Sequence, residues 1–177
     1  AGSGKTIVLA LKTAYLHAQH PDWKIAVTFN TRSLKGQLRQ LINTFYIEQT
    51  SEEPDWDNVN IVHAWGAPGG GEKNGIYYAF CSANNVEYYD FLTARNKYGQ
   101  TDPFGEICAK ALSEAKTFEP IYDVILVDEA QDFSPAFLRL CYEMLKEPRR
   151  LVYAYDELQN LRSQSLPSPE VIFGKLQ

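Results

Sequence analysis

Short apolar stretches that alternate with amphipathic ones constrain the fold of this chain more than any other feature of its sequence. Residues 24–30 (KIAVTFN), 123–127 (DVILV) and 151–155 (LVYAY) have the apolar, β-branched character of strands that are buried on both faces. Segments with apolar residues at helical spacing separate them, and they run from the Gly-rich start to about residue 20, over residues 34–47 and over residues 135–145. This alternation is typical of a parallel sheet with helices on both faces, so the sequence predicts an α/β fold.

The middle of the chain is less regular. A short strand is expected over residues 60–63, and a Pro/Gly loop follows it over residues 66–75. Residues 76–98 are rich in tyrosine and fit no single element, whereas helices are expected within residues 87–95 and over residues 104–116. No internal repeat is present, so we expect one domain over residues 1–177.

Composition excludes several classes of protein. A chain of 177 residues with 45% hydrophobic residues can bury a full core without a disulfide or a structural metal. Cys81, Cys108 and Cys141 are odd in number and far apart, which argues against a disulfide framework or a zinc site and favours a reduced, cytoplasmic setting. No apolar run approaches the length that spans a bilayer, so no membrane partner is expected.

Charge is unevenly distributed along the chain. The formal net charge is −5, but residues 1–47 carry six lysines and arginines against one aspartate. A local positive field attracts phosphates whatever the global charge is. The alternative is an uneven surface without function.

The first motif is Ala1-Gly2-Ser3-Gly4-Lys5-Thr6, which matches all but the start of the phosphate-binding pattern GxxxxGK[ST]. Backbone N–H groups of Gly2, Ser3 and Gly4 would converge on a phosphate, Lys5 would reach the β- and γ-phosphates, and Thr6 would place its hydroxyl on Mg²⁺. A Gly/Ser turn before a helix is the alternative. The pattern's first glycine and the strand before it would precede Ala1, so we expect that this chain is cut from a longer one.

The second motif is Asp128-Glu129-Ala130-Gln131-Asp132, directly after the apolar strand. An acid at a strand end beside a phosphate loop is where hydrated Mg²⁺ is held, and the next glutamate can take a proton from the attacking water. We therefore assign the magnesium side to Asp128 and the general base to Glu129. Alternatively, Asp132 or Ser134 caps the following helix.

A third motif, Tyr155-Asp156-Glu157-Leu158-Gln159, follows the last apolar strand. The carboxamide of Gln159 could hydrogen-bond both a γ-phosphate and the attacking water, and so sense the state of the nucleotide. A polar loop is the alternative.

The order GSGKT, DEAQDFSP and DELQ resembles the UvrD/Rep branch of superfamily 1 helicases. The resemblance implies a P-loop NTPase whose motor clamps ATP and Mg²⁺ between two RecA-like domains, with this chain as a partial first domain. Its N-terminal strand and the second motor domain would be missing, and residues 66–118 would be a reduced insertion. The resemblance further implies 3′ to 5′ movement on single-stranded DNA.

Two segments then correspond to DNA contacts of that family. They contribute Phe29, Asn30, Thr31, Arg32, His63 and Trp65. Independently, no acid occurs between residues 23 and 47, where bases alternate with aromatic residues that could stack on nucleobases. Structural alternatives remain: Phe29 as a core residue, His63 as a structural histidine, and Trp65 packed against the following loop.

A second hypothesis for function is a P-loop module that uses nucleotide to switch a protein partner without DNA translocation. The stretch after Gln159 lacks the aromatic pair that the family commonly carries there, which favours this hypothesis slightly. Arginines from a second motor domain would also be needed for fast hydrolysis. We therefore expect the chain alone to bind nucleotide weakly and to hydrolyse it poorly.

Overall fold

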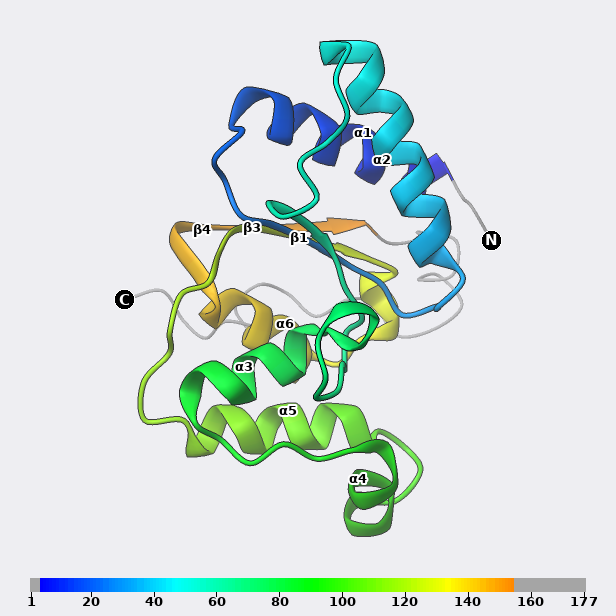
Figure 1. Cartoon of the computed structure of the whole chain (residues 1–177). Coiled ribbons are helices and arrows are strands. Elements are labelled where there is room, and N and C mark those ends of the chain that lie inside the picture. Colours follow the sequence, from blue (N-terminus) through cyan, green and yellow to red (C-terminus); the bar gives the residue numbers. More distant parts are fainter. Residues whose placement is uncertain (1–3, 155–177) are drawn as a thin grey trace.

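The computed structural model describes residues 4–154, which form one four-stranded sheet and six α-helices (Figure 1). The strands are β1 (Ile25–Thr28), β2 (Val59–Ile61), β3 (Tyr122–Asp128) and β4 (Leu145–Ala154). All neighbouring strands are parallel, in the order β2-β1-β3-β4. The prediction of an α/β fold with a parallel sheet is confirmed.

Helices α1 (Gly4–Gln19) and α2 (Leu34–Thr50) cover one face of the sheet (Figure 1). Side chains of β3 alternate between the two faces, as they must in a strand. Val124 and Leu126 pack with α1 and α2, whereas Ile125 and Val127 belong to the core on the other side. A strand buried on both faces explains why this stretch is apolar at every position.

The other face is covered by α3 (Ile76–Asn84), α5 (Pro103–Glu114) and α6 (Pro135–Glu143), with the short α4 (Phe91–Tyr98) outermost (Figure 1). Residues 66–118, the segment that we interpret as an insertion, supply three of these helices. Their apolar side chains join those of α6 and the sheet in one hydrophobic cluster. The segment thus forms a layer of the core.

Three element boundaries differ from expectation. Helix α3 lies in the tyrosine-rich region that fits no single element by sequence, because its residues are apolar nearly all round. Helix α4 starts within the expected range, where the Asp90 side chain accepts a hydrogen bond from the Thr93 N–H, but it extends beyond residue 95 to Tyr98. Strand β4 begins at the buried Leu145, which pairs with Tyr122, and a register shift over residues 146–149 precedes the pairing that resumes at Arg150.

The Pro/Gly loop is pinned where its two ends meet. A Cβ on Gly75 would clash with the backbone of Gly66, and Gly66 has a positive φ of 76°. Only glycine fits such an approach without moving the backbone. Between these glycines lies one short 3-10 turn, η1 (Gly71–Lys73).

None of the helices between residues 4 and 154 is long and apolar enough to span a bilayer. All three cysteines are buried and have free thiols.

Candidate functional site

Parallel pairing brings three sequence-predicted segments to one edge of the sheet. Strands β1, β2 and β3 all end there, so the loops that begin at Phe29, Val62 and Glu129 are neighbours although they are far apart in the chain. In open α/β sheets this edge is the usual place for a ligand. The N-terminus of α1 reaches the same edge through Thr6.

Thr6 and Asp128 meet in a buried hydrogen bond. The Thr6 hydroxyl donates to Asp128 Oδ2 at 2.8 Å, across 122 positions of sequence. The two residues are only 2% and 3% exposed. Burial raises the pKa of the Asp128 carboxyl, although the hydrogen bonds from Thr6 and from the Glu129 N–H oppose this effect. Burial disfavours the charged form of the Asp128 carboxyl. A bound cation would favour that form, so this carboxylate is suited to hold one.

Glu129 faces a different loop. Its Oε1 accepts hydrogen bonds from the backbone N–H of Thr31 at 2.8 Å and of Asn30 at 3.3 Å, and its Oε2 accepts one from the Thr31 hydroxyl at 2.9 Å. The backbone of Glu129 is left-handed, with φ 56° and ψ 40°, which few residues other than glycine adopt. Two adjacent acids are therefore divided between two partners: Asp128 contacts α1, and Glu129 contacts the loop after β1.

Asp132 strengthens the same connection. The Asn30 side chain hydrogen-bonds to Asp132, while burial and the nearby Glu129 raise the pKa of the Asp132 carboxyl. Ser134 is the N-cap residue of α6, but its side chain forms no hydrogen bond to the start of that helix. Ser134 thus occupies the N-cap position that the sequence offered, without a capping hydrogen bond, and Asp132 instead contacts Asn30, for which the sequence motif gives no signal.

No protein-family model, curated protein or solved structure matches this chain. The site is therefore interpreted from its own geometry.

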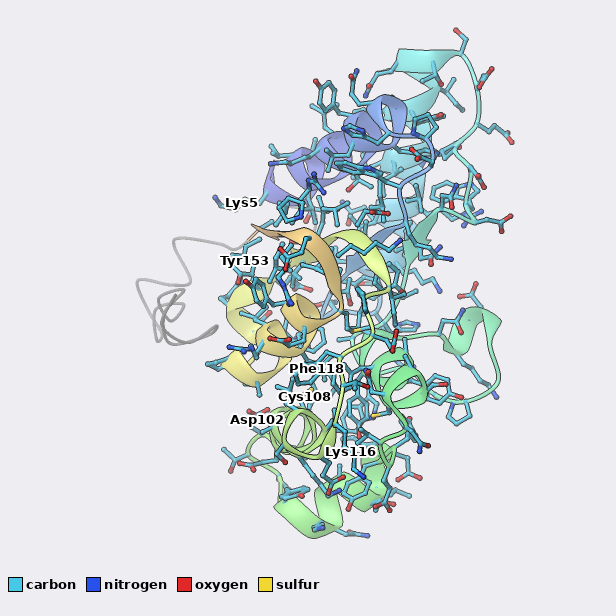
Figure 2. All side chains as sticks on the ribbon, turned by 90° about the vertical axis from the view of Figure 1, so that its left-hand side faces the viewer. Lys5, Asp102, Cys108, Lys116, Phe118 and Tyr153 are labelled. Atoms are coloured by element: carbon cyan, nitrogen blue, oxygen red, sulfur yellow. The ribbon has the colours of Figure 1, made fainter. Side chains whose placement is uncertain are left out.

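The described part of the phosphate-loop motif is Gly4, Lys5 and Thr6; Gly2, Ser3 and the predicted sensor Gln159 lie outside the described residues. Lys5 is exposed, and it lies near Tyr153 on one side of the molecule (Figure 2). Both residues border a cavity of about 400 Å³ at the end of β4. Lys5 is thus placed at the start of α1, as the motif requires, one residue before the buried Thr6.

Metal binding at this edge would need few protein ligands. No three His, Cys, Asp or Glu side chains among residues 4–154 gather into a group that could hold a metal alone. Mg²⁺ is usually held by one or two protein oxygens together with substrate phosphates and waters. The Thr6 hydroxyl and the Asp128 carboxylate fit that pattern.

A larger cavity of about 790 Å³ opens beside the loop after β1. It is bordered by sequence-predicted DNA contacts, namely Asn30, Arg32, His63 and Trp65, and by helices of residues 66–118. Aromatic side chains that sequence reasoning missed also line it, in particular Tyr88, Phe91 and Phe104. Phe91 is 55% exposed at the start of α4, so an aromatic face is open to solvent there.

The predicted aromatic contacts are used mainly for packing. Phe29 is 1% exposed and belongs to the core, so the interpretation of this residue as a core residue holds, and little of its ring is free to stack on a base. Trp65 is half-buried; its ring stacks on Phe104 at 5.0 Å and its Nε1–H donates to the Tyr89 carbonyl at 2.9 Å. His63 makes an edge-on contact with Phe29 at 5.4 Å between ring centroids.

The polar residues of this loop lie at the surface, but the Thr31 hydroxyl and the N–H groups of Asn30 and Thr31 donate to Glu129. Asn30, Thr31 and Arg32 are exposed. Burial, followed by the positive charges of Lys35 and Arg32, lowers the pKa of His63. Lys35 also forms an ion pair of 2.7 Å with Glu72, which is part of η1. This corner therefore gathers backbone N–H groups, a hydroxyl and cations, the kinds of group that contact phosphates, with the N–H groups and the hydroxyl engaged by Glu129.

Proposed function

We propose that this chain is the nucleotide-binding part of an ATP-driven DNA motor, a 3′ to 5′ helicase or translocase resembling the UvrD/Rep branch. The observation that carries the proposal is the buried hydrogen bond between Thr6 and Asp128. It joins the last residue of a phosphate-loop motif to a strand-terminal acid, the two groups that hold Mg²⁺ in P-loop NTPases.

The residues have distinct roles in this proposal. Lys5 and the start of α1 bind the phosphates, and Thr6 with Asp128 would hold Mg²⁺, which supplies neutralisation of phosphate charge when bound. Glu129 accepts a proton from the attacking water as the water oxygen bonds to the γ-phosphorus. The bond between that phosphorus and the β–γ bridging oxygen breaks, and its electron pair leaves with ADP.

DNA contact is supported by the corner around the larger cavity. The exposed loop of Asn30, Thr31 and Arg32 presents phosphate-binding groups, and Phe91 offers an open ring beside them. Single-stranded DNA is bound by this combination of donors and stacking surfaces without sequence preference. A second RecA-like domain would complete the ATP site, with Gln159 relaying the state of the γ-phosphate.

One observation favours the alternative function, a nucleotide switch that acts on a protein partner. Phe29 and Trp65, which would stack on bases in a motor, are largely committed to packing. A switch needs the ATP site but no DNA contact.

ATP turnover with and without single-stranded DNA tests the proposal in the full-length protein that carries this chain. A motor requires turnover that DNA stimulates strongly and that Lys5→Ala or Glu129→Gln abolishes, while Glu129→Gln spares ATP binding. Lys116→Ala is the matched control, because Lys116 is an exposed lysine far from Lys5 (Figure 2). Turnover that is indifferent to DNA would support the switch, and turnover that does not depend on Lys5 would refute both functions.

Polarity is tested separately on duplexes with single-stranded tails. Unwinding from a 3′ tail is expected; unwinding only from a 5′ tail would contradict the resemblance to this helicase branch.

A further inference from the structure

The loop after β1 supplies all the hydrogen-bond donors that the Glu129 carboxylate contacts. Both carboxylate oxygens accept from this loop, through two backbone N–H groups and the Thr31 hydroxyl. A general base must be within hydrogen-bond reach of the water that it deprotonates. Both oxygens of this carboxylate are bound to the loop, which lies 98 positions earlier in the chain. The orientation of the Glu129 side chain therefore depends on that loop.

The backbone of Glu129 adds to this restraint. A left-handed conformation in a residue other than glycine or asparagine persists only where its surroundings enforce it. The Glu129 N–H is also fixed, because it donates to Asp128 Oδ1 at 2.8 Å. The position of the side chain therefore follows from a strained turn that the loop after β1 stabilises.

The same donors face a second anion in the proposed motor. Asn30 and Thr31 are exposed, and Arg32 is exposed next to them. Backbone N–H groups, threonine hydroxyls and arginine are typical contacts of nucleic-acid phosphates. A phosphodiester group and the Glu129 carboxylate would compete for these N–H groups and this hydroxyl, because each donor hydrogen serves one strong acceptor at a time.

We propose that Thr31 is a positioning residue that holds the Glu129 carboxylate in an inactive place, and that single-stranded DNA bound at residues 30–32 takes over its donors and frees the carboxylate for the attacking water. This inference rests on the proposed function, and it gives that function a means of regulation. ATP hydrolysis would be slow without DNA because the base is engaged elsewhere. Linkage makes the coupling reciprocal, so removal of the carboxylate charge must strengthen DNA binding.

The test replaces the Thr31 hydroxyl and leaves the backbone intact. Thr31→Val loses the hydrogen bond to Glu129 Oε2, so DNA-independent kcat should rise about 3- to 10-fold, the net effect of one ordinary hydrogen bond. The KM for ATP should be unchanged, and the stimulation by DNA should fall by a similar factor. Thr31→Ser keeps the hydroxyl and should behave as the wild type.

Two controls define the origin of the effect. Thr44→Val makes the same replacement at an exposed position of α2 and should change nothing. Thr31→Val combined with Glu129→Gln should be inactive, because the gained turnover must pass through Glu129. A lower or unchanged DNA-independent kcat in Thr31→Val would overturn the inference while leaving the motor standing, provided that the wild type is stimulated by DNA.

Binding gives a second measurement that needs no turnover. Without nucleotide, Glu129→Gln should bind a fluorescent oligothymidine about 3- to 10-fold more tightly than the wild type, because the donors of residues 30 and 31 no longer face a charged acceptor that competes with the phosphates. Equal affinities would overturn the inference. If wild-type turnover, measured with and without DNA, does not depend on Glu129, the proposed function is refuted, and the inference is refuted with it.

Discussion

Replacement of Thr6 by valine measures how much the buried Thr6–Asp128 contact contributes to the fold. Valine has nearly the same shape as threonine, so no cavity forms, but Asp128 Oδ2 loses its donor at 2.8 Å. A buried acceptor left without a partner costs about 1 to 3 kcal/mol. For a domain of this size the unfolding temperature should fall by roughly 2 to 12 °C. Thr6→Ser keeps the hydroxyl and should lose less.

The pH dependence of this loss identifies its cause. Burial raises the pKa of Asp128 above its ordinary value of about 3.8, so the group favours folding at low pH, and this contribution is lost as the pH rises through the raised pKa. Below pH 3.8 the carboxyl carries its own proton and depends less on the Thr6 donor. The deficit of Thr6→Val should therefore grow from acid to pH 7.

Thermal unfolding of the nucleotide-free protein, measured by circular dichroism at several pH values, gives both quantities. The companion variant Asp128→Asn removes the charge, so Thr6→Val should cost less in that background. A Thr6→Val protein as stable as the wild type at pH 7, or a deficit that does not change with pH, would refute this reasoning.

Three further predictions concern other parts of the molecule. Gly75→Ala should destabilise the fold by about 1 to 3 kcal/mol in urea unfolding, since its Cβ meets Gly66, whereas Gly36→Ala on α2 meets nothing within 4 Å and should be neutral or stabilising. Burial lowers the pKa of His17, whose Nε2 accepts from the Asp55 N–H, so stability should fall as the pH drops below about 6.5, and His17→Gln should flatten that profile; equal profiles would contradict this. Arg32→Ala should weaken binding of single-stranded DNA and reduce its salt dependence by about one ion, and an unchanged salt slope would exclude a phosphate contact.

Much of the fold could be predicted because buried positions are apolar and recur with the period of the helix or strand that carries them. Strand β3 is apolar on both faces, and the alternation of Val124 and Ile125 between two cores explains why it could be recognised. Helix α3 could not be, because most of its residues are apolar or aromatic, including some that face solvent, so no clear polar face gives it a period. The position of Leu145 in β4 depends on pairing with Tyr122, which is a tertiary contact.

The candidate site divides in the same way. Lys5, Thr6 and Asp128 belong to local motifs, and the sequence predicted Thr6 and Asp128 on the same side of one site, whereas their direct hydrogen bond was found only in the structure. The partners of Glu129 follow from a left-handed turn and from strand order, neither of which a motif specifies. Phe29 illustrates the opposite error, because an aromatic residue beside cationic ones has the same signature whether it stacks on a base or fills the core.

The long sequence separations at this edge also have a consequence for folding. The contacts of Asp128 with Thr6 and of Glu129 with Thr31 close loops of 122 and 98 positions, and both require β3 to pair beside β1. Contacts of such high order form slowly and late. If this edge binds a nucleotide as we propose, the nucleotide would bind completed molecules and would stabilise the native state.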